Sequence, residues 1–364
     1  MSTPLFDRYP SLVNKVPYLP LADLPTSIEP LHFDDDAPND YSNLWIKRDD
    51  LSHKSYGGNK VRKLEFILAE AKSLDKHKVV TFGATGTNHG VATSLFCQQE
   101  NLACKIYLFD QPNTKTVQSN LKLMQVFNAQ LEHKGSLFKT ALSFYLEKLL
   151  AKLKLQKQSY FLFAGGSNIA GCLAFVNAAF ELKAQIDQLI VPEPDYIFCP
   201  VGSSATVAGL TLGCHLAGIN STVIGIRVAP SHLGIIPSCT PHTIQSLMTK
   251  TYRHLKRLDH SISRSKQQEQ ALPEIQLDNS HFGSGYGQLT KEGDQATALF
   301  SKAGITLEPT YTAKAAAAVL SHCNKHPEDK VLYWHTYNSA DVIVTSSKAK
   351  ISGFPNALQR YFSA

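Results

Sequence analysis

The chain has 364 residues, of which 43% are hydrophobic and 18% charged, with a formal net charge of +6. This composition is typical of a globular protein with one large or two medium cores, and the scattered lysines form neither a nucleic-acid stripe nor a membrane patch. The seven cysteines include no C-x-x-C pair, and no apolar run has the length of a signal-peptide core or a membrane span. These features argue against a disulfide framework and favour a cytoplasmic protein with reduced thiols.

Short apolar strands and helices alternate along the first half of the chain, after an irregular arm over residues 1–42. The predicted strands are 44–47, 78–82, 105–109, a short one near 129–131, and 160–163. The predicted helices are 60–74, 91–99, amphipathic ones within 114–128 and 136–156, and a long one at 169–188.

The second half repeats this alternation with one interruption. Its predicted strands are 196–200, 222–228 and 330–334, and its predicted helices are 207–217, one that ends at 302 and an alanine-rich one that ends near 323. Residues 229–280 lose the pattern, except for a basic helix-like piece near 245–270, and are interpreted as an irregular insertion. The alternation of short strands with helices predicts an α/β fold with largely parallel sheets.

Residues 56–65, YGGNKVRKLE, form the most distinctive stretch of the chain. Two glycines permit a sharp turn, and the apolar positions after them have helical spacing, so Lys60 is expected where a loop enters a helix. An amine at that place can meet a bound carbonyl or phosphate, because the free N–H groups of a first helical turn attract anions. The alternative is a glycine turn before a solvated basic helix start.

Several common sites are disfavoured by the motifs that are missing. No G-x-G-x-x-G lies at a strand-to-helix turn and no G-x-x-x-x-G-K-[ST] occurs, which disfavours a dinucleotide oxidoreductase and a P-loop enzyme. The histidines lack metal-ligand spacing, so no metal site is predicted.

Small-residue loops instead follow strands at 83–90, 164–168 and 202–206. The last loop leads directly into a helix, whose N–H groups can hold one phosphate. A single phosphate and a lysine amine together suggest pyridoxal phosphate, which is bound through a Schiff base.

Five motifs carry a resemblance to a known family. They are GGNKxRKLE at 57–65, TNH at 87–89, AGGSN at 164–168, GYG at 285–287 and PTYT at 309–312. In this order they resemble the 1-aminocyclopropane-1-carboxylate deaminase and D-cysteine desulfhydrase family of pyridoxal-phosphate enzymes, which has the tryptophan synthase β-like fold type II.

The resemblance covers roughly residues 40–345, except for the interruption at 229–280. It implies two open, twisted, mainly parallel α/β domains with the cofactor in the interdomain cleft. Residues 1–62 and 185–364 then form the large cofactor-binding domain, with the insertion 229–280, and residues 63–184 form the small domain.

By position, the resemblance also implies roles for individual residues. Lys60 corresponds to the Schiff-base lysine, which also moves the substrate α-proton. Asn88 corresponds to the asparagine that hydrogen-bonds the phenolic oxygen of the cofactor. Thr87 and His89 lie beside it, facing the substrate carboxylate, and Thr87 counts among the catalytic residues. A capped helix start would account for all three without any ligand.

The phosphate cup corresponds to a short loop in the second half of the chain. Its residues are Ser203, Ser204, Ala205 and Thr206, with Lys63 as an assisting cation. The family loop is rich in glycine, whereas Ser204 and Ala205 carry β-carbons that must avoid positive φ.

Two tyrosines, Tyr286 and Tyr311, correspond to those that line the family's active site, and we assign them as further catalytic candidates. Packing alone is the alternative for each. Thr312 stands at the position that faces the pyridine nitrogen, and His335 ends the last strand beside the ring.

The resemblance favours one reaction over another. The deaminases have glutamate at the position of Thr312 and glutamine at the position of His89. At both positions this chain resembles the desulfhydrases instead. A glutamate keeps the pyridine nitrogen protonated, whereas a hydroxyl can only donate to it or share a proton with it, which leaves the cofactor a weaker electron sink. A weaker sink suits the elimination of a good leaving group such as thiolate. The resulting prediction is a lyase that forms sulfide, pyruvate and ammonia from D-cysteine or a related β-substituted amino acid.

Some departures from the family keep other functions open. The family usually has serine at Thr87, and two glycines where this chain has Tyr337 and Asn338. The alternatives are an aminocyclopropane carboxylate deaminase, a non-catalytic pyridoxal-phosphate-binding protein, and an α/β protein without cofactor. The resemblance also implies a cytoplasmic homodimer that acts on a small amino acid.

Overall fold

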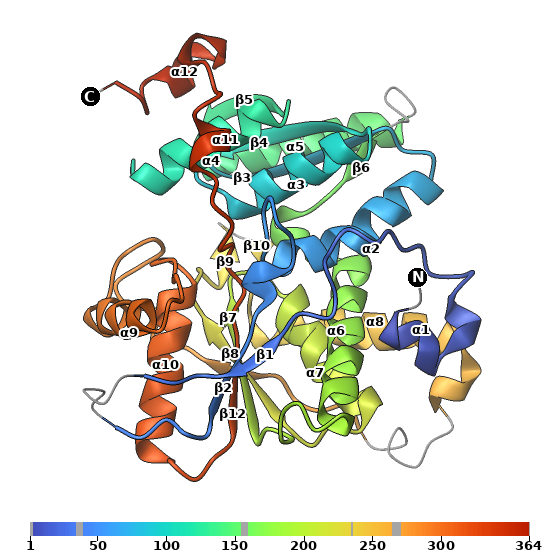
Figure 1. Ribbon diagram of the computed structural model, residues 1–364. Coiled ribbons are helices and arrows are strands. Elements are labelled where there is room, and N and C mark those ends of the chain that lie inside the picture. The colour runs from blue at the N-terminus through green and yellow to red at the C-terminus, as the bar shows by residue number, and fades with distance from the viewer. Residues whose placement is uncertain (1–2, 34–38, 154–158, 234–235, 264–270, 364) are drawn as a thin grey trace. The chain divides into compact units, whose positions relative to one another are not determined.

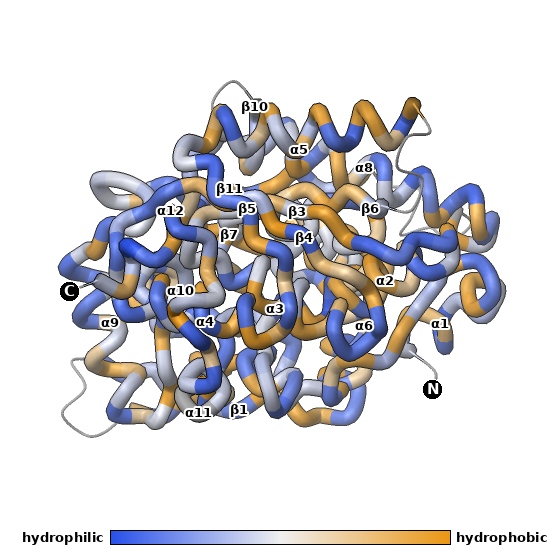
Figure 2. The backbone as a smooth tube through the Cα atoms, turned by 90° about the horizontal axis from the view of Figure 1, so that it is seen from above, coloured by the Kyte–Doolittle hydropathy of each residue, from blue (hydrophilic) through white to orange (hydrophobic). Residues whose placement is uncertain are grey.

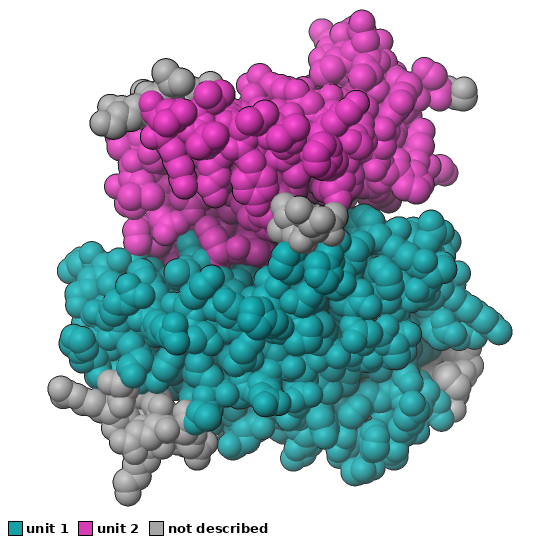
Figure 3. Space-filling model, turned by 180° about the vertical axis from the view of Figure 1, so that it is seen from behind, with its two compact units in different colours: residues 1–16, 22–63, 169–340 teal, residues 17–21, 64–168, 341–364 magenta. Residues whose placement is uncertain are grey.

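The computed structural model describes residues 3–33, 39–153, 159–233, 236–263 and 271–363. Backbone contacts divide the chain into two compact units, which Figure 3 shows in two colours. Unit 1 comprises Met1–Val16, Ala22–Lys63 and Ile169–Ala340, and unit 2 comprises Pro17–Leu21, Leu64–Asn168 and Asp341–Ala364.

The domain division predicted from the sequence stays a prediction, and these units differ from it at residues 17–21, 63, 169–184 and 341–364, of which the last two segments are the longest. Residues 169–184 belong to unit 1, because the helix that they begin packs on another helix of that unit. Residues 341–364 belong to unit 2, where Tyr361 donates a hydrogen bond to Asp110 at 2.8 Å. Both assignments depend on long-range packing, which local sequence patterns do not report.

Unit 1 is built on a six-stranded sheet with the order β1-β2-β12-β7-β8-β11 (Figure 1). All neighbouring strands are parallel except β1 and β2. The strands are β1 (Ile28–Pro30), β2 (Leu44–Lys47), β7 (Tyr196–Val201), β8 (Thr222–Arg227), β11 (Gln276–Asp278) and β12 (Val331–Trp334), with a separate antiparallel pair, β9 (His232–Leu233) and β10 (Ile236–Pro237).

The helices of unit 1 surround this sheet. They are α1 (Pro4–Arg8), η1 (Pro10–Leu12), η2 (Asp49–Leu51), α6 (Ile169–Asp187), α7 (Ala205–Ala217), α8 (Pro241–Leu258), η4 (His260–Ser263), α9 (Lys291–Lys302) and α10 (Thr312–Lys325). Helix α2 (Asn59–Ser73) begins in unit 1 and continues into unit 2.

Unit 2 has a four-stranded, fully parallel sheet with the order β5-β4-β3-β6. Its strands are β3 (Lys78–Ala84), β4 (Ala103–Phe109), β5 (Gln130–Gly135) and β6 (Ser159–Phe161). Its helices are α3 (Asn88–Gln99), α4 (Lys115–Val126), α5 (Leu137–Lys152), η3 (Ala164–Gly166), α11 (Ile343–Ser346), η5 (Ile351–Gly353) and α12 (Asn356–Gln359). The predicted α/β fold with two mainly parallel sheets is therefore confirmed.

Helices α6 and α7 lie in the interior of unit 1, and most of their residues are buried. They approach so closely that a β-carbon on Gly209 would lie 2.4 Å from the carbonyl oxygen of Cys172. Helix α6 has a mean hydropathy of 1.3 over 18 residues, so by length and composition alone it resembles a membrane span. In the structure 78% of that window is buried, as in the core helix of a globular unit.

The described parts of the segment 229–280 are more regular than their sequence suggested. Helix α8 buries Ile244, Met248 and Leu255, spaced as one helical face, and packs on α6 and α7. Its start at Pro241, capped by Thr240, is a typical helix N-terminus, although the prolines of this segment suggest a loop. Strand β11 forms one edge of the sheet. It has only three residues, with polar residues on either side of Leu277, which is too short to be recognised as a strand from the sequence.

Candidate active site

The turn before α2 needs both of its glycines. A β-carbon on Gly57 would lie 2.1 Å from the carbonyl oxygen of Asp50. Gly58 has φ +96°, and a β-carbon there would lie 2.7 Å from the carbonyl oxygen of Thr336. The Asn59 N–H donates to that same oxygen at 3.1 Å. Close backbone packing therefore fixes the entry into α2 and the position of the lysine that follows.

Asn338, one of the departures from the family pattern, helps to hold this turn. Its Oδ1 accepts the N–H of Gly57 at 2.6 Å and that of Ala340 at 3.1 Å. The asparagine side chain thus accepts a hydrogen bond from a backbone N–H group of the turn. The departure is compatible with an intact lysine turn.

We expect Gly58→Ala to destabilise the protein by more than the ~1–2 kcal/mol that a left-handed alanine costs, because its β-carbon also meets backbone. Gly304→Ala is the matched control, since Gly304 has φ +71° and a β-carbon added to it would meet nothing within 4 Å. Urea denaturation measures the free energy of unfolding of both variants. Equal losses in the two would show that the backbone contact at Gly58 has no cost.

A buried ionic cluster anchors the first turn of α2 to the core of unit 1. Arg62 donates to both carboxylate oxygens of Asp49 at 2.8–2.9 Å and to both of Glu181 at 2.9 Å. Glu181 also accepts from Lys47 at 2.6 Å, and Asp49 accepts from the indole of Trp334 at 2.8 Å. All four charged side chains are at most 3% exposed. Below we call this set the Arg62 cluster.

Lys60, the second residue of α2, is half-buried and donates to Asn59 Oδ1 at 2.9 Å. Burial lowers the pKa of its amine to about 8. One turn on, burial and the charge of Lys60 lower the pKa of Lys63 well below its usual range. A much larger fraction of the Lys60 amine is therefore uncharged and nucleophilic at neutral pH than in an exposed lysine.

Two side-chain contacts join this turn to the loop before α7. Lys63 Nζ donates to Ser203 Oγ at 3.2 Å, and Asn59 Nδ2 donates to Thr206 Oγ1 at 3.2 Å. The structure thus brings the predicted Schiff-base lysine and the predicted phosphate loop together within unit 1.

The start of α7 has the features of an anion site. No side chain caps it, and the Ser204 hydroxyl donates instead to the carbonyl oxygen of Ser238 at 2.6 Å. Neither Ser204, with φ −69°, nor Ala205 adopts a positive φ, so their β-carbons fit without strain. The first-turn N–H groups of this 13-residue helix can therefore meet an anion.

The two predicted tyrosines lie together beside this loop. The hydroxyl groups of Tyr286 and Tyr311 are hydrogen-bonded, and their rings meet edge to face with centroids 6.0 Å apart. The Tyr311 ring packs on Gly202, where a β-carbon would lie 2.6 Å from it. Burial raises the pKa of both phenols, so both are neutral and able to donate a proton or a hydrogen bond.

Thr312 is buried and its hydroxyl is already used by the backbone. It accepts the N–H of Glu308 at 2.6 Å and lies 3.3 Å from the Glu308 carbonyl oxygen. The Glu308 carboxylate accepts the N–H groups of Thr310 and Tyr311, and burial raises its pKa. A contact from Thr312 to a ring nitrogen would have to compete with these bonds.

His335 follows β12 and is fully buried. Its Nε2 lies 3.1 Å from the Thr306 carbonyl oxygen, and a carbonyl only accepts, so Nε2 carries the hydrogen. Burial lowers the pKa of the ring, which favours neutral imidazole.

The predicted residues of unit 2 lie at the start of α3. The Thr87 side chain caps this helix, accepting the Gly90 N–H at 3.1 Å. Asn88 Oδ1 accepts from Asn120 Nδ2 at 2.8 Å, and the His89 ring is buried with Nε2 3.0 Å from Thr81 Oγ1. The capping contact is the one that a capped helix start without a ligand requires. The roles of Thr87, Asn88 and His89 in binding a ligand stay predictions.

Several residues that support the site were missed from the sequence. They are Asp49, Glu181, Asn120, Glu308 and Asn338. A signal existed for Glu181, an acid inside an apolar helix, which must be paired once it is buried. Asp49, Asn120 and Asn338 are buried against partners that are distant in sequence, and Glu308 lies in a loop without a regular pattern.

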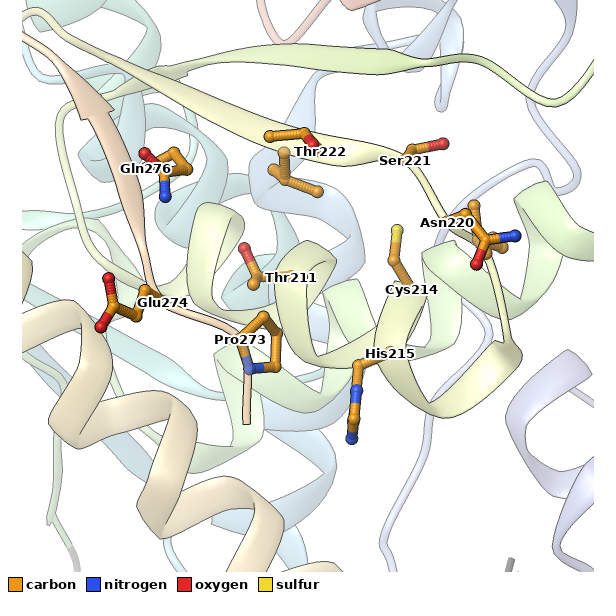
Figure 4. A pocket seen from close by; sticks show the side chains of 11 residues that line it. Thr211, Cys214, His215, Asn220, Ser221, Thr222, Pro273, Glu274 and Gln276 are labelled. Carbon is orange, nitrogen blue, oxygen red and sulfur yellow. The ribbon is translucent and has the colours of Figure 1, made fainter. Parts of the chain in front are cut away.

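A cavity of about 300 Å³ lies at the far end of α7 from the Ser203 loop (Figure 4). Side chains that line it include Thr211 and His215 of α7 and Thr222 of β8. None of the residues predicted for the site is among its lining, so this cavity is separate from the lysine turn. No group of three or more metal-ligating side chains occurs within the described ranges.

A half-buried lysine amine of lowered pKa, tied in unit 1 to an uncapped helix start beside a tyrosine pair, in a chain with two mainly parallel α/β sheets, defines a pyridoxal-phosphate enzyme of fold type II. The family described as "Pyridoxal-phosphate dependent enzyme" matches residues 21–336. The chain belongs to this family, and pyridoxal phosphate is its cofactor.

Solved structures share the fold at low sequence identity. One is described as an ACC deaminase homologue, with 24% identity, coverage of 96% of this chain and 98% of that one, and a TM-score of 0.72. A hydrogen sulfide-producing enzyme from Fusobacterium nucleatum has 16% identity, coverage of 88% and 96%, and a TM-score of 0.55. A fungal L-serine ammonia-lyase from Rhizomucor miehei has 14% identity, coverage of 90% and 98%, and a TM-score of 0.55.

Proposed function

We propose that this enzyme eliminates sulfide from D-cysteine or a closely related β-substituted amino acid, with Lys60 as the residue that holds the cofactor and moves the α-proton. The observation that carries the proposal is the half-buried Lys60 amine, whose pKa is lowered to about 8, at a turn joined to the Ser203 loop. An amine with this pKa is suited both to bind a carbonyl and to act as a base near neutral pH.

The residues of unit 1 fit the cofactor. The uncapped start of α7, with Ser203, Ser204, Ala205 and Thr206, offers hydrogen bond donors to its phosphate, and a phosphate anion beside Lys63 would favour the charged form of that amine. When bound, pyridoxal phosphate supplies the electron sink that makes the α-proton acidic. Asn88 and Thr312 are proposed to contact the ring, and Thr87, Asn88 and His89 the substrate carboxylate.

The reaction balances with water alone. The Cα–H bond breaks and Lys60 takes the proton. The electron pair of the broken bond forms the Cα–Cβ double bond, and the Cβ–S bond breaks. The neutral phenols of Tyr286 and Tyr311 are the proposed proton donors for the leaving sulfur. Water then converts the released aminoacrylate into pyruvate and ammonia.

One observation supports thiolate as the leaving group. Thr312 supplies a hydroxyl where a glutamate would keep a ring nitrogen protonated, and a weaker sink is adequate for a good leaving group. The hydrogen sulfide-producing enzyme among the structures of similar fold is compatible with this chemistry, although its 16% identity supports the fold alone.

The test is an assay of the purified, cofactor-loaded enzyme with D-cysteine, L-cysteine and aminocyclopropane carboxylate. We expect equal amounts of sulfide and pyruvate from D-cysteine, with at least ~10-fold higher kcat/KM than from the other two. Sulfide from L-cysteine only, or 2-oxobutanoate from aminocyclopropane carboxylate as the main product, would contradict the substrate assignment but not the role of Lys60.

An aminocyclopropane carboxylate deaminase is the second candidate, and the homologue with 24% identity is the observation that favours it. A non-catalytic cofactor-binding protein is the third, favoured by Tyr337 in place of a glycine and by Thr87 in place of a serine. Turnover of any amino acid that disappears in a Lys60 variant would rule out the third.

The lowered pKa of Lys60 predicts how cofactor uptake depends on pH. Only the uncharged amine attacks the cofactor aldehyde, so the uptake rate of apoprotein is expected to rise with pH and level off above about 8. Stopped-flow absorbance after addition of pyridoxal phosphate measures this rate. A midpoint near 10.5, the usual lysine value, would show that burial does not lower the pKa of the reacting amine.

A further inference from the structure

Helix α5 of unit 2 exposes an apolar face. Seven large apolar side chains on it, and at its C-cap, are between 39% and 76% exposed. They are Phe138, Leu142, Tyr145, Leu146, Leu149, Leu150 and Leu153, which we call the α5 stripe. Figure 2 shows the apolar residues of α5 along its length. The sequence pattern suggested an ordinary amphipathic helix here, with its apolar side in the core.

The opposite face of α5 already attaches the helix to the sheet of unit 2. Phe144 packs against Phe82 with ring centroids 4.9 Å apart. The buried Glu147 accepts from Tyr107 at 2.6 Å and forms ion pairs with Lys78 and Lys105 at 3.0 and 3.1 Å. The inward face is therefore fixed by its own contacts, and turning the helix to bury the stripe would expose this cluster.

The stripe is large enough for a stable interface. Seven side chains that are about half exposed offer roughly 600 Å² of apolar surface, against about 800 Å² that each partner buries in a standard interface. A patch of this size is at the upper end of what a monomer normally exposes.

The order of the stripe residues identifies the partner. Six of the seven positions are symmetric about the midpoint between Tyr145 and Leu146, and the seventh, Leu150, mirrors Ala141, which is also apolar. Phe138 mirrors Leu153, and Leu142 mirrors Leu149. An antiparallel copy of the same helix, related by a two-fold axis at this midpoint, would place apolar side chains against apolar side chains throughout.

The charged residues of α5 fit the same arrangement. Lys139 lies on one edge of the stripe, and Lys148 and Lys152 lie on the other, so none interrupts it. In the antiparallel pair, Lys139 of one copy and Lys152 of the other would lie at the same height along the helix axes. They would lie on opposite edges of the contact, which keeps the like charges apart.

We propose that the α5 stripe is the contact between two copies of this chain, which pair α5 with α5 in antiparallel orientation about a two-fold axis between Tyr145 and Leu146. The proposal does not depend on the substrate of the enzyme. It specifies which side chains approach their own copies and which do not.

Cysteine cross-linking tests the geometry. Leu146 lies next to the proposed axis, so its two copies would have Cα atoms about 6 Å apart, within disulfide range. The two copies of Phe138 would be 15 residues apart along the pair, about 22 Å. The seven native cysteines are buried, so single Leu146→Cys and Phe138→Cys variants can be compared in the holoenzyme.

Under a mild oxidant we expect a covalent dimer from Leu146→Cys and none from Phe138→Cys. Equal cross-linking of both, or of neither, would overturn the proposed pairing. Because each variant changes one exposed side chain, folding is not at risk, and the visible absorbance of the bound cofactor verifies it.

Sedimentation velocity tests the interface energetically. Wild type is expected to be a dimer at micromolar concentration, and Leu142→Glu/Leu149→Glu to dimerise at least ~100-fold more weakly, because two charges would be buried in the stripe. Leu74→Glu, at a 55% exposed leucine after α2, is the matched control and should stay dimeric. A monomeric wild type, including one that binds anionic phosphatidylserine vesicles through the stripe, would overturn the proposal.

Discussion

Replacing Lys60 by alanine is expected to lower turnover of D-cysteine by at least ~10³-fold, because one amine both holds the cofactor and moves the α-proton. The same variant should lose the visible absorbance of the lysine-bound cofactor while the phosphate loop is left intact. Steady-state sulfide release and an absorbance scan of the purified protein measure the two effects.

The structure provides a control for this substitution. Lys54→Ala removes an exposed lysine six residues before Lys60 and should leave both rate and absorbance unchanged. Circular dichroism of both variants verifies the fold. Turnover in Lys60→Ala within tenfold of wild type would contradict the role of Lys60 and direct attention to Lys63, the buried amine three residues further along α2.

Replacing Arg62 by alanine is expected to destabilise the protein by about 3–5 kcal/mol, because it leaves Asp49 and Glu181 buried without their main counter-charge. Since Arg62 lies two residues after Lys60, cofactor retention should also fall. The free energy of unfolding from urea denaturation of the apoprotein measures the first effect separately from ligand binding.

Helix α6 supplies a matched control for the Arg62 cluster. Lys183 pairs with Asp187 on the exposed side of the helix that carries Glu181, and Lys183→Ala should cost less than ~1 kcal/mol. Losses of similar size in Arg62→Ala and Lys183→Ala would show that the buried cluster does not anchor α2.

Glu181 makes the same cluster sensitive to acid. Burial alone would raise its pKa, but the charges and hydrogen bonds of Arg62 and Lys47 outweigh it and lower the pKa from 4.5 to about 2. A carboxyl whose pKa is lower in the folded state stabilises the fold at pH values above its pKa in the unfolded state. This contribution is lost as pH falls from 4.5 toward 2. Glu181→Gln should therefore flatten the decline in unfolding free energy over this range, and an unchanged decline would contradict it.

The local part of the fold was predictable because strands and turns in this chain have strong short-range patterns. Strands such as 196–201, followed by a small-residue loop and then a helix, identified the Ser203 loop without any long-range information. The two glycines before Lys60 identified the turn for the same reason. The structure shows how closely Thr336 approaches them, which the pattern did not.

The parts that could not be predicted depend on partners distant in sequence. The membership of α6 in unit 1 follows from its packing on α7, and the Arg62 cluster joins residues up to 285 positions apart. The length of α8 was obscured by Pro241 and by its basic surface. The Thr312 hydroxyl bonds to the Glu308 backbone, so the residue that favoured one substrate from the sequence also has a structural role.

Covalent identification of the cofactor-bearing lysine tests the proposed site most directly. The holoenzyme would be reduced with borohydride, which makes the link between lysine and cofactor permanent, and then digested and analysed by mass spectrometry. We predict a single pyridoxyl-modified peptide with the modification on Lys60. A modification on Lys63 or on any other lysine would contradict the assignment of Lys60, whichever substrate the enzyme uses.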